Sequence, residues 1–300
     1  MKSKSTSKND SQLPKIDTLG ERIYSELYSS SAIAWDILGL AAKKLLDDAI
    51  ATCDAEAANR AWFFYKIVQV RRAYISSIEH LRNGDFYEGW CELERVEIGL
   101  IVLRMNPFDN CKKFGVTELT ELVANWQSLF PYRIFFSPEF AIRREECSIC
   151  GHGVDPWSPC RHEPLRVYAG RECYRIMKEL EVLGVSLVLD PVQKYSVARV
   201  MSEDANGKKI DQFNYSPVRF VIERLSTVFS NWNAVWTYEL HPHSLFKDRQ
   251  PDGPCPCESG RSYRHCCLDK DGVRRPHVQI QFADPPPAHL PNLEFSGYGN

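Results

Sequence analysis

Two segments of helical periodicity are joined by the stretch His80-Leu81-Arg82-Asn83-Gly84-Asp85-Phe86-Tyr87-Glu88. Asn83-Gly84 suits the left-handed cap that ends many helices. Asp85 can cap the following helix while Glu88, three residues later, reaches back to the Asp85 amide. The stretch therefore predicts a helical hairpin with one apolar face on each arm. These faces consist of Phe63, Ile67, Val70, Tyr74, Ile78 and Leu81 on the first arm, and Phe86, Trp90, Leu93, Val96, Leu100 and Leu103 on the second.

Helical periodicity continues on both sides of the hairpin. An earlier amphipathic helix is predicted from the spacing of Ile33, Ile37, Leu40, Ala41 and Leu45. Pro107 ends the second arm of the hairpin, because proline disfavours continued helix. A further helix is predicted over residues 117–130 and is closed by Pro131. Residues from about 18 to 131 are thus expected to be all-helical.

Four acidic residues of the second arm, Glu88, Glu92, Glu94 and Glu97, raise the question of a carboxylate metal site. Di-iron bundles need a Glu-x-x-His step on facing helices, and this sequence has none. The spacing of the four glutamates instead predicts a charged outer face of the helix.

The overall composition limits the classes of partner. The chain has 300 residues, 37 basic and 39 acidic, so its formal net charge of −2 provides no global field for a polyanion. The apolar runs 37–42 and 98–103 fall far short of the roughly 20 residues that a membrane-spanning helix needs. The polar first fifteen residues lack a secretory or transit signal. We therefore expect a cytoplasmic protein without membrane insertion, in which cysteines do not form a disulfide framework.

The second half of the chain has a different character. Residues 146–201 are rich in loop-forming residues, with β-prone runs at 185–189 and 195–201 around a turn at Asp190-Pro191. Residues 216–240 predict one more helix, and residues 278–282 one strand. The predicted helix carries the apolar residues Val221, Leu225, Val228, Phe229, Trp232 and Trp236.

Seven of the eleven cysteines lie in two groups, which indicates metal sites in a reducing compartment. The C-terminal group lies in Pro254-Cys255-Pro256-Cys257-Glu258-Ser259-Gly260-Arg261-Ser262-Tyr263-Arg264-His265-Cys266-Cys267. A closed structural zinc site takes four such ligands in a tetrahedron, with zinc–sulfur bonds of about 2.3 Å. Ser259-Gly260 lets the chain turn back, and a turn of helix after it would place Tyr263 beside the site. The predicted ligands are Cys255, Cys257, Cys266 and Cys267.

This stretch resembles the SEC-C motif, the small zinc module at the C-terminus of the bacterial preprotein translocase ATPase and in many other bacterial proteins. Every position of the P-C-x-C-x-S-G-x-x-Y-x-x-C-[C/H] pattern is met. The resemblance implies a docking module that presents basic side chains to a protein or ribosomal partner. The matching basic residues are Arg261, Arg264, Lys270, Arg274 and Arg275. Outside the motif the chain departs from the translocase, since it lacks a phosphate-binding G-x-x-x-x-G-K-[ST] loop.

The central group combines the C-x-x-C pair Cys147 and Cys150 with the C-x-H pair Cys160 and His162. A C-x-x-C turn directs two sulfur atoms at one point, and C-x-H can supply two more ligands from a second turn. The spacing predicts a second structural zinc ion, with Cys173 as an alternative to His162. Around this group, Phe130-Pro131-Tyr132 and residues 185–195 look similar to uncharacterised bacterial proteins that also carry SEC-C, a likeness that implies no activity.

No nucleophile elbow, H-E-x-x-H pair or dinucleotide-binding loop occurs in the sequence, so no catalytic residue is predicted. An enzyme remains an alternative if its site forms between the helical domain and the central cysteines, with Cys173 or His162 free of metal. A weaker alternative is nucleic-acid binding through the central arginines, although glutamates are interspersed among them. The arginines concerned are Arg143, Arg144, Arg161, Arg166, Arg171 and Arg175.

The sequence thus predicts a mainly α protein with small zinc-stabilised modules, of the α+β type. Its expected parts are a disordered tail (1–17), a helical domain (18–135), a zinc module with three cysteine ligands, one histidine ligand and short strands (136–202), a helix and linker (203–250), the SEC-C zinc motif (251–272) and a flexible tail (273–300). The expected function is that of a zinc-binding adaptor for a protein or ribosomal partner.

Overall fold

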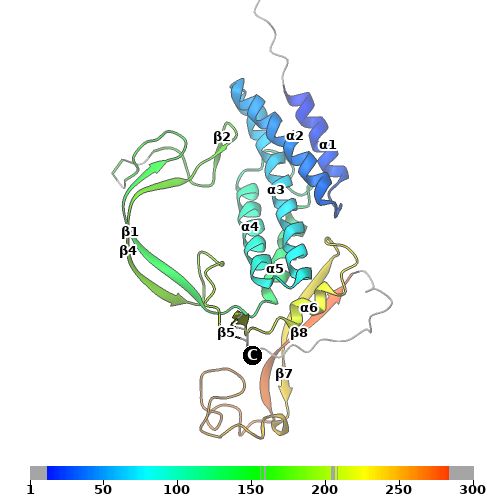
Figure 1. Cartoon of the computed structure of the whole chain (residues 1–300), viewed down its shortest axis with the longest axis vertical. Helices are drawn as coiled ribbons and strands as arrows, with labels where there is room; N and C mark the ends of the chain where they lie inside the picture. Colours follow the sequence, from blue (N-terminus) through cyan, green and yellow to red (C-terminus); the bar gives the residue numbers. More distant parts are fainter. Residues whose placement is uncertain (1–11, 156, 159, 204–206, 208, 284–300) are drawn as a thin grey trace, which may run out of the picture. The chain divides into compact units, whose positions relative to one another are not determined.

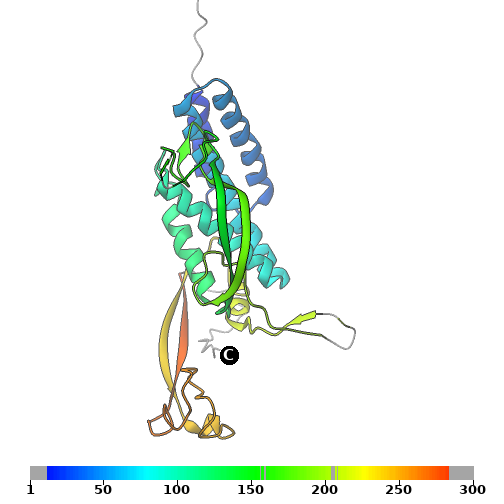
Figure 2. The ribbon, with the colours of Figure 1, turned by 90° about the vertical axis from the view of Figure 1, so that its left-hand side faces the viewer.

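The computed structural model describes residues 12–155, 157–158, 160–203, 207 and 209–283. The chain folds as two compact units, which are described separately (Figures 1 and 2). The first unit comprises Met1–Val123 and Ile134–Ala198, and the second comprises Ala124–Arg133 and Arg199–Asn300.

Helices form the body of the first unit. They are α1 (Leu13–Ser25), α2 (Ala32–Ala51), α3 (Ala55–Asn83), α4 (Phe86–Met105) and the first part of α5 (Val116–Ser128). Helix α3 packs against both α2 and α4, and Figure 1 shows α3 between these two neighbours. The predicted hairpin is confirmed, and each residue assigned to its two apolar faces is buried.

The turn of the hairpin differs from the predicted capping arrangement. Gly84 adopts a left-handed conformation with φ of +84°, which glycine tolerates because it has no Cβ. The Asp85 amide donates to the His80 carbonyl oxygen (2.9 Å), and the Gly84 amide donates to that of Leu81 (3.2 Å). These two bonds form a Schellman motif. Because the Asp85 amide is used there, it is not available to the Glu88 side chain, and the Asp85 side chain makes no capping bond either.

Helix α2 exists where the sequence predicts it, but it buries a different face. The predicted stripe is largely exposed, with 73% of Ile33 and 75% of Leu40 accessible to solvent. The core side of α2 instead consists of Trp35, Leu38, Ala42, Leu46 and Ala49. Because α2 is apolar around most of its circumference, its periodicity fits both faces. The Trp35 side was selected by packing, and its indole donates to the Ser29 carbonyl oxygen.

The helical region also starts earlier than predicted. Helix α1 begins at Leu13, inside the segment expected to be a disordered tail, and its Ile16, Leu19 and Ile23 are buried at helical spacing. Pro14 lies in the first turn, where its missing amide costs no helical hydrogen bond. Residues 1–11 of the predicted tail lie outside the described residues.

A long antiparallel ribbon completes the first unit. It pairs β1 (Phe135–Cys147) with β4 (Arg175–Val188), and the segment between them carries the short strands β2 (Val167–Tyr168) and β3 (Arg171–Glu172). The β-prone run 185–189 is therefore largely a strand, as predicted. Its partner is β1, with Pro138 opposite Val185, and not the run 195–201 beyond Asp190-Pro191. Of the predicted run 195–201, Val197 forms an isolated antiparallel bridge with Phe135 in this unit.

Glu94 does not belong to a charged outer face of α4. Its side chain is buried (5% exposed), and its carboxylate accepts the backbone amides of Lys194 (2.5 Å) and Tyr195 (2.8 Å). Burial raises the Glu94 pKa above its usual value, although these two amides oppose the shift. Glu97 pairs with the Lys194 ammonium at 2.7 Å. Glu94 therefore anchors the loop that follows β4 on α4.

Replacing Glu94 by alanine is expected to release this loop. Two amide donors would lose their acceptor, at a cost of about 1–3 kcal/mol for each donor that stays buried. Hydrogen exchange at the Lys194 and Tyr195 amides should accelerate strongly, whereas the exposed neighbour Glu88, replaced in the same way, should leave them unchanged. Equal exchange in the two variants would show that Glu94 does not hold the loop.

The second unit is built around another ribbon. It contains β5 (Met201–Glu203), β6 (Lys209–Asp211), α6 (Ser216–Ile222), β7 (Trp232–His241), the 3-10 turn η1 (His243–Phe246) and β8 (Val273–Phe282). The predicted helix over 216–240 is wrong beyond Ile222, because residues from Trp232 onward form β7. The predicted tail is wrong over 273–282, which is β8 and includes the predicted strand at 278–282. Residues 284–300 lie outside the described residues.

Trp232 and Trp236 explain the mistaken helix. They are four residues apart, which fits a helical stripe, but they also alternate with Asn233 and Thr237 as a strand requires. Pairing with β8 decides between the two, since Trp232 faces Phe282 and Trp236 faces Val278. Within the second unit, Trp232 also packs edge-on against Trp126, with ring centroids 4.9 Å apart.

Strands contribute more to the architecture than a mainly α fold suggests. The described residues contain six α-helices and eight strands, arranged in four two-stranded antiparallel sheets. Among these residues, no helix combines the length and the apolar composition that a membrane crossing would need. Both long ribbons have the same plan: residues 148–174 lie between β1 and β4, and residues 242–272 lie between β7 and β8. These two inserted segments, or the strand ends beside them, hold the clustered cysteines.

Candidate metal centres

The segment between β7 and β8 brings four thiols together. The sulfur atoms of Cys255, Cys257, Cys266 and Cys267 all lie within 4.8 Å of one another. The Sγ–Sγ distance is 3.4 Å from Cys257 to Cys266 and 3.8 Å from Cys266 to Cys267. A tetrahedron with metal–sulfur bonds of about 2.3 Å has edges of about 3.8 Å. The spacing of the four thiols thus suits one tetrahedral ion.

Local backbone geometry creates this arrangement. Glu258 and Gly260 both have positive φ, so the chain reverses after Cys257. The Cys255 amide then donates to the Arg261 carbonyl oxygen (2.8 Å). The amides of Cys266 and Cys267 both donate to the Tyr263 carbonyl oxygen in one tight turn. As predicted, Tyr263 packs beside the thiols, in a small core with the four cysteines and Val273.

The ionisation of these thiols favours a bound cation. Burial opposes ionisation of Cys257, but the Ser259 hydroxyl and the Cys255 and Cys266 thiols lower the pKa of Cys257 to about 6. Burial, and then hydrogen bonding to the neighbouring thiols, raise the pKa of Cys255 to about 12. Four adjacent thiols cannot all become thiolates without a compensating positive charge, and a coordinated divalent cation supplies that charge.

His243 joins this module to the start of the insertion. Its Nε2 lies 2.8 Å from the Lys270 carbonyl oxygen, and its Nδ1 lies 2.5 Å from the Tyr263 hydroxyl. A carbonyl oxygen only accepts, so Nε2 donates to the Lys270 carbonyl oxygen, and Nδ1 shares the second hydrogen bond with the Tyr263 hydroxyl. His243 therefore fixes Tyr263 beside the thiols. Its place two residues after His241 in a proline-containing stretch did not indicate this role.

The basic residues predicted to face a partner occupy different environments. Arg261 and Lys270 are exposed, and the exposed Arg264 pairs with Asp252 at 3.2 Å. Arg274 lies over the Tyr238 ring, 3.9 Å from its centroid. Arg275 is buried and donates to the Pro256 carbonyl oxygen and to Glu258. The Arg275 guanidinium therefore holds the cysteine segment from inside, and the other four basic residues remain at the surface.

The central group also comes together in space. Ligand atoms of Cys147, Cys150, Cys160 and His162 lie within 4.8 Å of one another. Cys147 is the last residue of β1 and is buried, and the Gly151 amide donates to its carbonyl oxygen to close the C-x-x-C turn. His162 Nδ1 is buried and has no hydrogen-bond partner among the described residues, as expected for a nitrogen that binds a metal. The four residues fit one zinc ion with three sulfur ligands and one nitrogen ligand.

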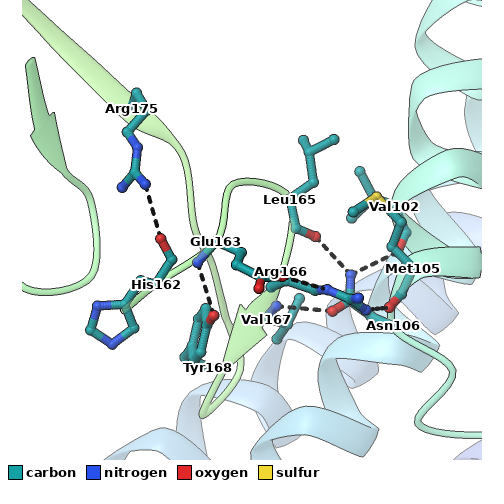
Figure 3. A network of polar contacts seen from close by, with 10 residues as sticks. All are labelled: Val102, Met105, Asn106, His162, Glu163, Leu165, Arg166, Val167, Tyr168 and Arg175. Atoms are coloured by element: carbon teal, nitrogen blue, oxygen red, sulfur yellow. Dashed lines mark hydrogen bonds and ion pairs between the residues drawn. The ribbon is translucent and has the colours of Figure 1, made fainter. Parts of the chain in front are cut away.

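Arg175, the first residue of β4, braces the second half of this group (Figure 3). It donates to the Cys160 sulfur (3.3 Å) and to the His162 carbonyl oxygen (3.0 Å). The Tyr168 ring lies edge-on to the His162 imidazole, with centroids 4.6 Å apart. Such outer contacts orient metal ligands and reduce the negative charge on a thiolate.

Asn106, directly after α4, attaches the central module to the helices, as Figure 3 shows. Its side-chain amide donates to the carbonyl oxygens of Leu165 (2.7 Å) and Val102 (2.8 Å) and accepts the Val167 amide (3.0 Å). Arg166 donates to the Met105 carbonyl oxygen beside it. The sequence around Asn106 does not indicate this role, because an asparagine at a helix end is also common as a local cap.

Cys173 lies next to this group. It is 1% exposed, and its sulfur is 3.8 Å from that of Cys147. Burial and the neighbouring Cys147 raise the pKa of Cys173 to about 11, whereas backbone amides and the Cys160 and Cys150 thiols outweigh burial and lower that of Cys147 to about 6. The geometry therefore places Cys173 as a hydrogen-bonding neighbour of Cys147, while His162 belongs to the mutually close set.

Three of the six central arginines have acidic partners. Arg143 pairs with Glu181 at 2.6 Å, and Arg144 lies 3.7 Å from Glu179. Arg166 is 3.4 Å from Glu163. These pairs reduce the positive field that a nucleic acid would require.

The chain therefore contains two Cys/His centres that could each hold a metal ion, and an antiparallel ribbon supports each of them. Residues 254–269 match the SEC-C motif, a zinc-binding motif, and this match lies within the segment between β7 and β8. No curated protein and no solved structure matches the chain.

Proposed function

We propose that this chain is a zinc-binding adaptor of the bacterial cytoplasm, with two structural zinc ions and a SEC-C module that docks on a protein or ribosomal partner. The main support is the set of four clustered thiols inside the segment that matches SEC-C. Each group offers four protein ligands, and a four-coordinate ion would then have no open position for a substrate. Such ions stabilise folded segments and do not perform chemistry.

The surface of the SEC-C module suits docking. Its interior consists of the thiols, Tyr263 and Val273. The charged side chains of Arg261 and Lys270 lie outside this interior and are exposed. A rigid zinc-stabilised segment can present such charges at low entropic cost. Charge complementarity then favours an acidic protein surface or the phosphates of ribosomal RNA.

The enzyme alternative has less support. It requires a reactive Cys173 or a metal-free His162 in the first unit. Cys173 is buried and its pKa is raised to about 11, the reverse of an activated thiol. His162 lies in the set of mutually close ligand atoms.

The proposal is tested by affinity capture from bacterial lysate and by co-sedimentation with purified ribosomes. The zinc-loaded intact chain is compared with Arg261→Glu/Lys270→Glu, with Cys255→Ser/Cys257→Ser, and with Lys112→Glu as a control at an exposed lysine of the first unit. We expect one partner or the ribosome to bind the intact chain and the control, and both module variants to lose it. Binding that survives both module variants, or no binding by the intact chain, would reject the adaptor role.

A further inference from the structure

The ribbon of the first unit has one continuous apolar face, here called the ribbon face. It consists of the cross-strand pairs Phe136–Leu187, Pro138–Val185, Phe140–Val182 and Ile142–Leu180. Seven of these eight side chains are exposed, from 39% for Phe140 to 65% for Leu187, and Pro138 is partly buried.

The opposite face of the ribbon is mostly polar. Over the length of the ribbon face its pairs are Ser137–Ser186, Glu139–Gly184 and Ala141–Glu181, and Arg143 forms an ion pair with Glu181. The apolar pair Phe135–Val188 follows at one end, and Leu183 is left unpaired at a bulge. This alternation is typical of an antiparallel sheet with one face in water and the other against a core. A two-stranded ribbon alone is marginally stable, so an apolar face of this length calls for a covering surface.

We propose that the ribbon face packs against the same face of a second copy of this chain. Its exposed side chains offer roughly 600 Å² of apolar area. That equals or exceeds the largest apolar patch of a typical monomer, about 300–600 Å². It approaches the ~800 Å² that each partner contributes to a stable interface.

The chemistry of the face favours a copy of the same chain over other occupants. All eight side chains are apolar, so the face has no cation for a phosphate or an acidic peptide and no anion for a basic one. Interfaces between identical subunits are the more apolar class, and a second copy is present at equal concentration from synthesis onward. Two such ribbons can stack about 10 Å apart at the small angle of aligned sheets, so that the same pairs meet across a two-fold axis.

The test is sedimentation of the zinc-loaded full chain at concentrations from about 1 to 100 μM, the range where a standard interface associates. Val185→Arg places a charge on the ribbon face, and Ser186→Arg places the same charge on the opposite face at the next residue. We expect the wild type and Ser186→Arg to dimerise, and Val185→Arg to dissociate about 100-fold more readily, because the guanidinium would be buried without a partner. Unchanged zinc content and circular dichroism would show that the variants fold.

Three results would overturn the proposal. The first is a wild type that remains monomeric at 100 μM, and the second is a Val185→Arg variant that dimerises as the wild type does. The third is a monomeric wild type that floats with phospholipid vesicles while the Val185→Arg variant does not. That result would assign the ribbon face to a lipid surface. None of these results depends on whether the SEC-C module docks on a partner.

Discussion

Replacing Cys255 by serine is expected to remove one of two zinc ions from the chain and to unfold the segment between β7 and β8. The segment has a small apolar core, made mainly of its own cysteines with Tyr263 and Val273. Zinc bound by small modules contributes about 10–16 kcal/mol to their folding at neutral pH. Loss of one thiolate ligand should therefore lower the folding free energy of this segment more than loss of any other single interaction within it.

Metal content and hydrogen exchange measure this effect. The number of zinc ions per chain should fall from two to one. The amides of Cys266 and Cys267, which donate to the Tyr263 carbonyl oxygen in the intact chain, should lose their protection from hydrogen exchange. The exposed Cys53, replaced by serine in the same way, should leave both readings unchanged. A Cys255→Ser chain that keeps two zinc ions or a protected segment would refute a structural ion at this site.

The second large effect distinguishes Cys147, a member of the central group, from its buried neighbour Cys173. Cys147→Ser is expected to abolish zinc binding at this group, whereas Cys173→Ser should retain both zinc ions, although the two sulfur atoms are 3.8 Å apart. A serine hydroxyl can replace the Cys173 thiol as a hydrogen-bond donor, but it cannot replace a thiolate ligand.

The same measurements decide which residue is the fourth ligand. His162→Ala should weaken zinc binding at the central group, because one of its four candidate ligands would be missing. Loss of one zinc ion in Cys173→Ser, with no loss in His162→Ala, would instead assign Cys173 as the ligand. Protease resistance of residues 148–174 should follow the zinc content in every variant, since the described part of this segment contains only two very short strands.

Local spacing was sufficient for the helical hairpin and for both groups of candidate metal ligands. The α3–α4 turn depends on neighbouring residues around Gly84, and a C-x-C or C-x-x-C turn brings its two sulfur atoms together without help from distant residues. For the same reason the turn at Ser259-Gly260 and the packing of Tyr263 were predictable. The predicted bond from the Asp85 amide to the Glu88 side chain failed within this same turn, because that amide donates to the His80 carbonyl oxygen. The Asp85 side chain makes no capping bond either.

Contacts between residues far apart in the chain settled the remaining features. The β7 segment carries a pattern that fits a helix and a strand equally well, and β8 made it a strand by pairing with it. Which face of α2 is buried depended on which of its two apolar sides packed against α3. The burial of Glu94 depended on a loop a hundred residues later in the chain. A strand needs hydrogen bonds from a partner strand, and a buried carboxylate needs hydrogen-bond donors. In both cases the partner lies far away in the chain, so the nearby residues do not reveal it. Residue spacing thus specified which side chains gather at the two candidate metal centres, whereas tertiary packing specified the ribbons that carry these centres and the faces left in contact with water.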